Sequence, residues 1–139
     1  MGLVYAQIKL VNSDDKALHR SGYISKDEIR QMNVTAMVDS GAIMMVINEN
    51  IKTQLGLASI NFQEAQLADG SLVELEIVGP LEVIFENRRS TCDAMVIPGD
   101  NEILLGAIPM EQMDVMIHPK ENRLIVNPEH PYKAVVKLK

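Results

Sequence analysis

Tryptophan is absent from this sequence, and its aromatic residues are limited to three tyrosines and two phenylalanines. Aliphatic side chains and the nine methionines are therefore expected to fill the core, and stacking of nucleic-acid bases on aromatic rings is not expected. Basic residues are also few, because 13 lysines and arginines stand against 19 acidic residues, and the formal net charge is −6. Since this charge repels phosphate backbones, and Arg88-Arg89 is the only adjacent basic pair, the sequence predicts no nucleic-acid partner.

Cysteine and long apolar segments are equally scarce. Cys92 is the only cysteine, so no disulfide can form within the chain, and a reducing, cytoplasmic location is predicted. The first ten residues lack the features of a signal peptide, and no apolar run reaches membrane-spanning length, so no membrane partner is predicted. The composition is that of a folded globular protein, with 47% apolar and 23% charged residues, and residues 1–139 are predicted to form one domain.

Short strands dominate the predicted secondary structure. Alternating apolar and polar residues predict strands at 73–77 and 81–85, and Asp69-Gly70 before them predicts a tight hairpin turn with an exposed tip. A helix of about two turns is predicted between Asn48 as N-cap and Gly56 as a left-handed stop. Further strands are predicted at 3–11, 33–38, 42–47, 91–97, 102–105, 114–117 and 123–126, and a second short helix at 109–113.

The fold class that follows is all-β, as a sandwich or a closed barrel, because many short strands occur with few helices. Residues 12–32 are polar and show no sustained periodicity, so they are predicted to form a surface excursion between the first two strands. A weak internal repeat favours the barrel. The segments TAMVDSGAI and EILLGAI both run from an apolar strand into a glycine followed by Ala-Ile, which indicates two related halves.

Asp39 is the residue most indicative of chemistry, because it lies in the apolar run VTAMVDSGAIMMVI without another charge nearby. Burial of an isolated carboxylate is costly unless hydrogen bonds hold it or a perturbed protonation equilibrium is its purpose. Ser40 supplies a hydroxyl, and Gly41 allows a sharp turn and a close approach to a ligand. The alternative is an ordinary Asp-Ser-Gly turn at the end of a strand, which has no catalytic role.

The wider context resembles the retropepsin-like aspartic proteases, in the single-lobe form found in bacteria and archaea. The resemblance covers residues 3 to about 128 and rests on VDSGA, on the Asp69-Gly70 hairpin and on LLG at 104–106. It implies an all-β, closed retropepsin-like (acid protease) barrel with one or two short helices. It also implies an aspartic endopeptidase with Asp39 as its catalytic carboxylate, acting on an extended peptide or unfolded protein without a cofactor.

The same resemblance implies roles for the residues around Asp39. The family's chemistry needs two facing aspartates, and this sequence contains one Asp-Ser-Gly motif, so a homodimer is expected. Ser40 and Gly41 would support the dyad. The substrate-binding residues would be Gly41 and Ala42 at the cleft edge, together with three residues of a flap, Asp69, Gly70 and Ser71.

Two features bear on how such a dimer is held together. Charged residues that follow the motif in the viral enzymes are replaced here by Ile43, Met44 and Met45, and an arginine after the later glycine is replaced by Ala107. The ionic brace of the viral dimer has therefore lost both ends. The C-terminal tail, 129–139, is a candidate for the dimer interface.

Other residue types carry weaker signals. His19, His118 and His130 lie far apart in the sequence, so no metal site is predicted, and Cys92 is predicted to be a packed thiol. Glu111 and Asp114 are expected to cap or flank a short helix, and both side chains are expected to be exposed to solvent. Two other functions remain open, namely a catalytically inactive peptide-binding or adaptor module on the same barrel, and a structural subunit of a larger assembly.

Overall fold

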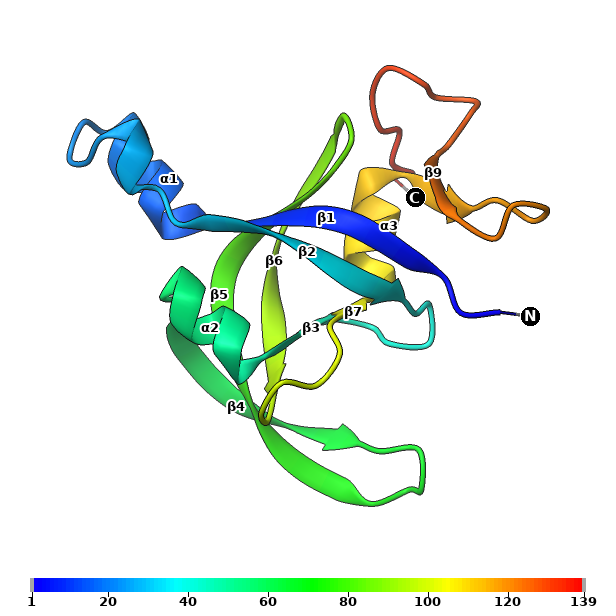
Figure 1. The fold of residues 1–139 in the computed structure, drawn as a ribbon, viewed down its shortest axis with the longest axis horizontal. Coiled ribbons are helices and arrows are strands. Elements are labelled where there is room, and N and C mark those ends of the chain that lie inside the picture. Colours follow the sequence, from blue (N-terminus) through cyan, green and yellow to red (C-terminus); the bar gives the residue numbers. More distant parts are fainter. Residues whose placement is uncertain (1, 139) are drawn as a thin grey trace.

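The computed structural model describes residues 2–138 and is predominantly β (Figure 1). Three α-helices and one 3-10 helix accompany the strands in this range, so the prediction of one or two helices was too low. The helices are α1 (Ser13–Arg20), η1 (Lys26–Glu28), α2 (Glu49–Leu55) and α3 (Ala107–Met113). The strands are β1 (Tyr5–Asn12), β2 (Gln31–Val38), β3 (Met45–Asn48), β4 (Ala58–Gln66), β5 (Leu72–Phe85), β6 (Arg88–Ile97), β7 (Leu104–Leu105), β8 (Val115–Ile117) and β9 (Leu124–Val126).

Seven strands form one sheet in the order β1-β2-β7-β3-β6-β5-β4, and β5 also pairs with β1. β8 and β9 form a separate hairpin beyond α3. Side chains of successive strand residues point to opposite faces, so alternate residues of β1 and β2 enter the core. The core is aliphatic with some methionine, as the composition predicts, and its most buried members include Leu10, Met45, Ile47, Leu81, Leu105 and Met113.

The short helix α2 and the hairpin before β5 were both predicted correctly. Asn48 caps α2 by accepting a hydrogen bond from the Ile51 amide at 2.9 Å, and Gly56 ends the helix in the left-handed conformation. In the hairpin tip only Gly70 has a positive φ, at 88°, so Asp69 does not share the unusual conformation. The strands predicted at 73–77 and 81–85 join into the single long strand β5, with a register shift where it passes residues 79 and 80.

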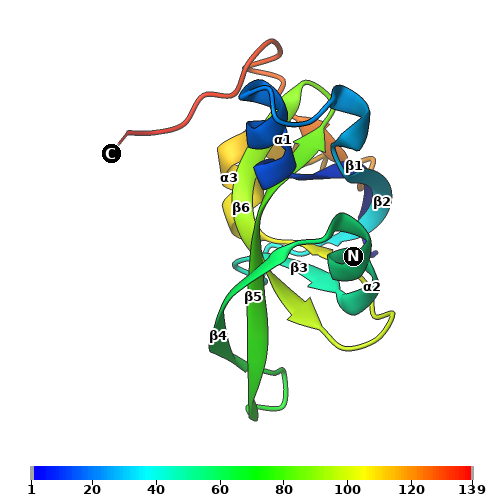
Figure 2. The ribbon, with the colours of Figure 1, turned by 90° about the vertical axis from the view of Figure 1, so that its left-hand side faces the viewer.

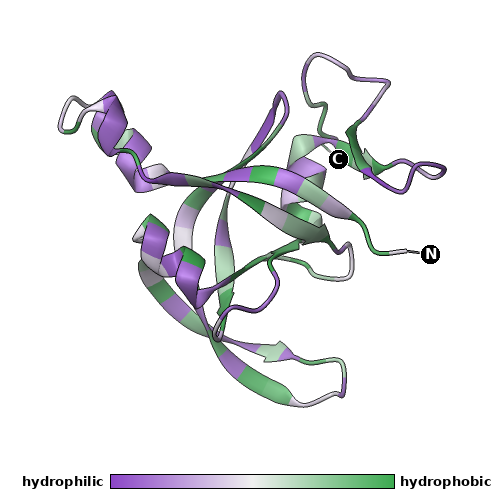
Figure 3. Ribbon diagram, viewed as in Figure 1, coloured by the Kyte–Doolittle hydropathy of each residue, from purple (hydrophilic) through white to green (hydrophobic). Residues whose placement is uncertain are grey.

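The segment 12–32 is more regular than predicted, because it contains α1 and η1 (Figure 2). α1 begins at an N-cap hydrogen bond from the Asp15 amide to the Asn12 side chain. The buried Asp15 carboxylate then accepts hydrogen bonds from the Arg30 side chain and amide, at 2.8 to 3.0 Å. Figure 3 shows that α1 is mostly hydrophilic. Polar contacts hold this helix in place, so its sequence lacks the apolar periodicity by which a helix is usually recognised.

The sequence did not predict strand β4, because nearly all of its side chains are exposed and show no apolar pattern. It is the last strand of the sheet order and pairs with β5 through the backbone from Ala58 to Gln66. Such an edge strand shows no alternation between a buried and a solvated face. In residues 2–138, no helix combines the length and apolar character needed to cross a membrane.

Candidate active site

Asp39 follows the last residue of β2 and lies in a tight turn. Its amide donates to the carbonyl oxygen of Leu105 at 3.0 Å, and its carbonyl accepts from the Ala42 amide at 3.1 Å. The Asp39 side chain is half-buried, and its Oδ1 accepts from the Gly41 amide at 2.9 Å. One carboxylate oxygen of Asp39 is thus held by the turn, and the residue is still partly exposed to solvent.

The segment 104–108 supports this turn from a distant part of the sequence. β7 lies parallel to β2, with Leu105 opposite Val38, and antiparallel to β3, so it fills the space between the two strands that flank the turn. Beyond β7, the Ala107 amide donates to the Ala42 carbonyl at 2.7 Å, and the Ile108 amide donates to the Ile43 carbonyl at 2.9 Å. The two segments of the weak internal repeat are therefore neighbours in space.

Gly106 is the point of closest approach between these segments. A Cβ atom built at Gly106 would lie 2.1 Å from the carbonyl oxygen of Met44 and 2.8 Å from that of Ala42. Both contacts are with backbone, so a flexible side chain cannot relieve them. The glycine is required here by space, since its backbone is extended, with φ at −89° and ψ at −179°.

The neighbours of Asp39 differ in exposure. Ser40 and Gly41 are exposed, Ala42 is half-buried, and no hydrogen bond of the Ser40 hydroxyl is found within residues 2–138. A Cβ at Gly41 would lie 3.1 Å from Asp39 Oδ1, so a side chain there would press on the carboxylate. The structure therefore brings Ser40, Gly41 and Ala42 together around Asp39.

The hairpin of β4 and β5 extends as an arm, and Figure 1 shows its tip on the same side of the molecule as the loop that follows β2. At the tip, Asp69 Oδ1 accepts from the Ser71 hydroxyl at 2.6 Å and from its amide at 2.9 Å. These bonds lower the pKa of Asp69, the hydroxyl bond first. Asp69, Gly70 and Ser71 thus form a turn of their own, and within the described residues no hydrogen bond or ion pair joins them to the Asp39 turn.

Sequence reasoning missed a set of exposed apolar side chains on the hairpin and beside the Asp39 turn. No periodicity could reveal them, because an exposed apolar residue looks like a core residue in sequence. Single residues of this kind are common on protein surfaces, but this set lies on the β4–β5 hairpin and on the two segments that meet beside the Asp39 turn. Its members are Ile43, Ile60, Phe62, Leu67, Leu72 and Ile108.

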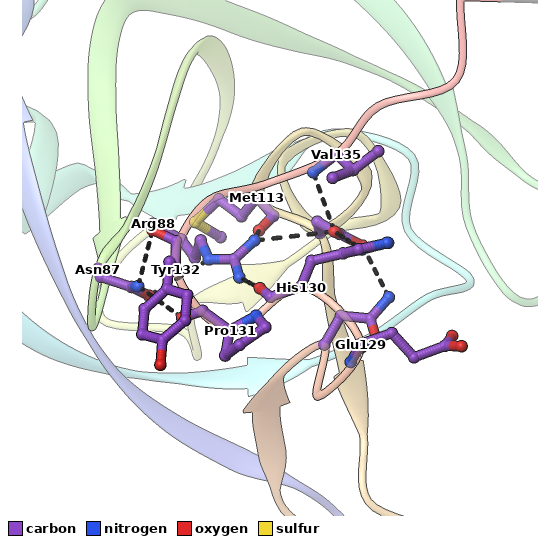
Figure 4. Close-up of polar contacts among 10 residues, drawn as sticks. Asn87, Arg88, Met113, Glu129, His130, Pro131, Tyr132 and Val135 are labelled. Atoms are coloured by element: carbon purple, nitrogen blue, oxygen red, sulfur yellow. Dashed lines mark hydrogen bonds and ion pairs between the residues drawn. The ribbon is translucent and has the colours of Figure 1, made fainter.

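Asp114 was predicted to be solvated, and this prediction was wrong. It ends α3 in the left-handed conformation, at φ 55° and ψ 55°, and its side chain is only 15% exposed. Its carboxylate accepts from the Val135 amide at 3.0 Å and from the Asn127 side chain at 3.1 Å, and it contacts the His130 ring at 2.6 Å (Figure 4). Asp114 therefore fastens the C-terminal segment to the end of α3.

Arg88 completes this polar cluster from β6. Its guanidinium is almost fully buried, donates to the Met113 carbonyl at 3.2 Å and to the His130 carbonyl, and lies 3.7 Å from Asp114 Oδ2. The neighbouring Asn87 side chain donates to the Pro131 carbonyl at 3.0 Å (Figure 4). The first part of the predicted interface tail, up to Val135, is thus bound to its own chain.

The Asp114 cluster predicts a specific loss of stability in acid. The hydrogen bond from Val135 is the largest cause that lowers the Asp114 pKa from 3.8 to about 2, and Asn127 and His130 add to it. Because the folded-state pKa is depressed, the stabilisation is complete above about pH 4 and is lost as the pH falls through about 2. Asp114→Asn, which tolerates the left-handed backbone, should lower the unfolding free energy at neutral pH by about 1 to 2 kcal/mol.

Urea unfolding of the wild type and of this variant, followed at several pH values, measures the effect. Glu111→Gln is the matched control, since Glu111 is an exposed carboxylate on the same helix. The difference between wild type and Asp114→Asn should shrink towards pH 2, whereas the control should stay close to wild type throughout. Equal stability of Asp114→Asn and wild type at neutral pH would contradict this account.

Cys92 and clusters of metal-binding side chains are the other groups that could supply chemistry. Burial, and then the charge of Asp93, raise the pKa of the Cys92 thiol to about 12, so the thiol is protonated at neutral pH and suits packing better than nucleophilic attack. Within residues 2–138, no group of three or more His, Cys, Asp or Glu side chains is placed to hold a metal ion.

Comparison with known proteins identifies a similar fold among solved structures. No protein-family model matches the sequence, and no curated protein sequence matches it. Among solved structures, the retroviral protease-like domain of Ddi1 from Leishmania major is similar, with a TM-score of 0.56. The match covers 92% of this chain and 90% of that domain at 18% sequence identity. The chain therefore has a retropepsin-like fold, and at this identity the likeness extends to the fold alone.

Proposed function

We propose that the chain is an aspartic endopeptidase that acts as a homodimer, with one Asp39 from each subunit. The observation that carries the proposal is the Asp39 turn on a retropepsin-like fold, with its carboxylate half-buried and one oxygen held by the Gly41 amide. Two such carboxylates facing each other cannot both ionise readily, and they share a proton. One then accepts a proton from a water that attacks the scissile carbonyl, and the other donates a proton to the carbonyl oxygen.

The need for a second subunit comes from the count of carboxylates at the turn. Among residues 2–138, no second carboxylate is hydrogen-bonded to Asp39, and the chain contains one Asp-Ser-Gly motif. Asp69 is engaged in the hairpin tip and Asp114 in the C-terminal cluster. A two-fold axis beside the turn supplies the partner from a copy of the same residue, and the exposed Ser40 hydroxyl would then bond across the axis.

The substrate in this proposal is an extended peptide or an unfolded protein segment. The long edge strand β4 and its hairpin tip form the flap, with Asp69, Gly70 and Ser71 at the end that closes over the peptide. Gly41 and Ala42 would offer backbone groups to the peptide, as in strand addition. The exposed apolar side chains Phe62, Leu72 and Ile108 favour substrates with apolar residues near the cleaved bond.

The dimer would be held without the ionic brace of the viral enzymes. Within each subunit, backbone hydrogen bonds from Ala107 and Ile108 to Ala42 and Ile43 stabilise the segment that follows Asp39. Between subunits, the end of the tail supplies exposed apolar groups, Val136 and Leu138, beyond the point where Asp114 holds Val135. We therefore assign the end of the tail to the proposed interface.

A concentration series tests the dimer and the activity together. Cleavage of a denatured protein substrate should rise with the square of enzyme concentration while monomers predominate, and linearly once dimers predominate, because only the dimer has two carboxylates. Sedimentation at the same concentrations, with assays across about pH 3 to 8, measures both quantities. A chain that stays monomeric and inert across these conditions would refute the endopeptidase and support the peptide-binding or adaptor module.

A further inference from the structure

A hollow of about 300 Å³ lies between α1 and the strands β5 and β6, away from the Asp39 turn. Figure 1 shows α1 at the opposite end of the molecule from the loop that follows β2, and Figure 2 shows α1 beside the upper part of β5. The volume is at the lower end of the range for small-molecule sites. The hollow is lined by Ser13, Lys16, Arg20, Glu82, Arg89 and Thr91.

Glu82 is the buried centre of this hollow, with a side chain only 2% exposed. It accepts from Lys16 Nζ at 2.7 Å and from Arg89 Nε at 2.6 Å, so one carboxylate orients two cations from different elements. A buried carboxylate needs charged or hydrogen-bonding partners. The pair of contacts satisfies Glu82, and it also holds Lys16 and Arg89 in place at the rim.

The positive charge at this site exceeds what Glu82 requires. Lys16 and Arg20 are four residues apart on α1 and therefore share one helix face, where like charges destabilise a helix. Within residues 2–138 Arg20 forms no ion pair. Three cations surround one carboxylate, which gives a local charge of +2 in a chain whose net charge is −6.

The available donors match an oxyanion. The structure gives the Arg89 guanidinium one bond to Glu82 through Nε, so its two terminal nitrogens remain as a planar fork, a geometry that suits phosphate. The hydroxyls of Ser13 and Thr91 line the same hollow and add neutral donors. A neighbouring hollow shares Lys16, Glu82 and Arg89 with this one and also contains Glu86, whereas Arg20, Ser13 and Thr91 line only the hollow beside α1.

We propose that the hollow between α1 and β5–β6 binds a small phosphate-type oxyanion through Lys16, Arg20 and Arg89. The juxtaposition that supports this is a buried Glu82 that positions two cations, with a third cation on the same helix face and two hydroxyls. The site is independent of the proposed peptidase, because none of its residues belongs to the Asp39 turn or to the tip of the β4–β5 hairpin. Its occupancy would attach α1 more firmly to the sheet.

Calorimetric titration of the full chain with inorganic pyrophosphate tests the site, with inorganic phosphate and citrate as comparison ligands. We expect saturable 1:1 binding of pyrophosphate with a Kd of about 1 mM or below, weaker binding of phosphate, and a loss of affinity as salt is raised. Arg20→Gln should weaken binding about tenfold without a change in thermal stability, since Arg20 is exposed and unpaired in the described structure. Arg89→Lys, which keeps the charge and removes the fork, should also weaken it.

Lys120→Gln is the control variant, because it removes one exposed positive charge from a different part of the surface. Its affinity for pyrophosphate should equal that of the wild type. Absence of saturable binding, or an equal loss in Lys120→Gln and Arg20→Gln, would overturn the site. Citrate binding as tight as that of pyrophosphate would overturn the assignment to phosphate-type ligands.

Discussion

Asp39→Asn is expected to abolish peptide cleavage, by about 1,000-fold or more, while the fold and the oligomeric state stay unchanged. The amide has nearly the shape of the carboxylate, and its oxygen can still accept the hydrogen bond that Asp39 Oδ1 receives from the Gly41 amide at 2.9 Å. The backbone bonds of the turn, to Leu105 and Ala42, do not involve the side chain. What is lost is the ability to take and give a proton, which general acid–base catalysis requires.

The measurement is the rate of cleavage of a denatured protein substrate at the pH optimum of the wild type, together with sedimentation and thermal unfolding of both proteins. Asp27→Asn is the matched control, because it makes the same chemical change at an exposed carboxylate in η1. The control should keep full activity. Sedimentation and thermal unfolding of Asp39→Asn should match the wild type, which separates a loss of the catalytic group from a loss of the fold.

A mixing experiment adds a readout that depends on the dimer. Excess Asp39→Asn protein should suppress wild-type activity, because mixed dimers contain a single carboxylate. In a monomeric mechanism the added variant has no effect. Retention of cleavage by pure Asp39→Asn protein would refute the assigned role of Asp39, and failure of the excess variant to inhibit would refute the shared site.

Gly106→Ala is expected to cause the largest loss of stability of the substitutions considered, about 3 kcal/mol or more. The new Cβ atom would lie 2.1 Å from the Met44 carbonyl oxygen and 2.7 Å from its carbon, well inside any tolerated contact. These atoms belong to the loop between Asp39 and β3, so relief requires that the loop move. The same movement would shift the Asp39 turn, and we expect activity to fall with stability.

Urea and thermal unfolding at one fixed protein concentration measure this effect, since a dimer's apparent stability depends on concentration. For a chain of this length the expected change corresponds to a fall of about 10 °C in Tm. Gly2→Ala is the control, because its Cβ would meet only the end of the Asn122 side chain, at 3.2 Å, and that side chain can move. A Gly106→Ala protein as stable as the wild type would show that the two loops are not packed as described.

Local signals accounted for much of the fold. The capped helix α2 was predictable because Asn48 and Gly56 act on their immediate neighbours through the backbone. Most of the strand positions followed from apolar clustering, and the turn at Asp69-Gly70 from its residue types. The predominance of strands was predicted for the same reason, and the similarity to the Ddi1 domain supports the retropepsin-like part of the predicted fold.

Elements held by long-range polar contacts were not predictable. α1 depends on the contact of Asp15 with Arg30, fifteen residues away, and β4 on backbone pairing along a solvated edge. Asp114 was misjudged because its partners Asn127, His130 and Val135 come from a tail with no pattern of its own. A sequence pattern reports which residues are apolar, and it does not report which polar groups meet.

The sequence by itself determined the chemical groups at the candidate site, because Asp39, Ser40 and Gly41 are consecutive and their turn is a local property. It also determined the aliphatic core, since few other apolar side chains are present. Only the tertiary structure decided that the segment around Gly106 lies against the Asp39 turn and that three cations gather around Glu82. Gly106 and Met44 are distant in the sequence, as are Lys16 and Glu82, and their closeness results from the folding of the whole sheet.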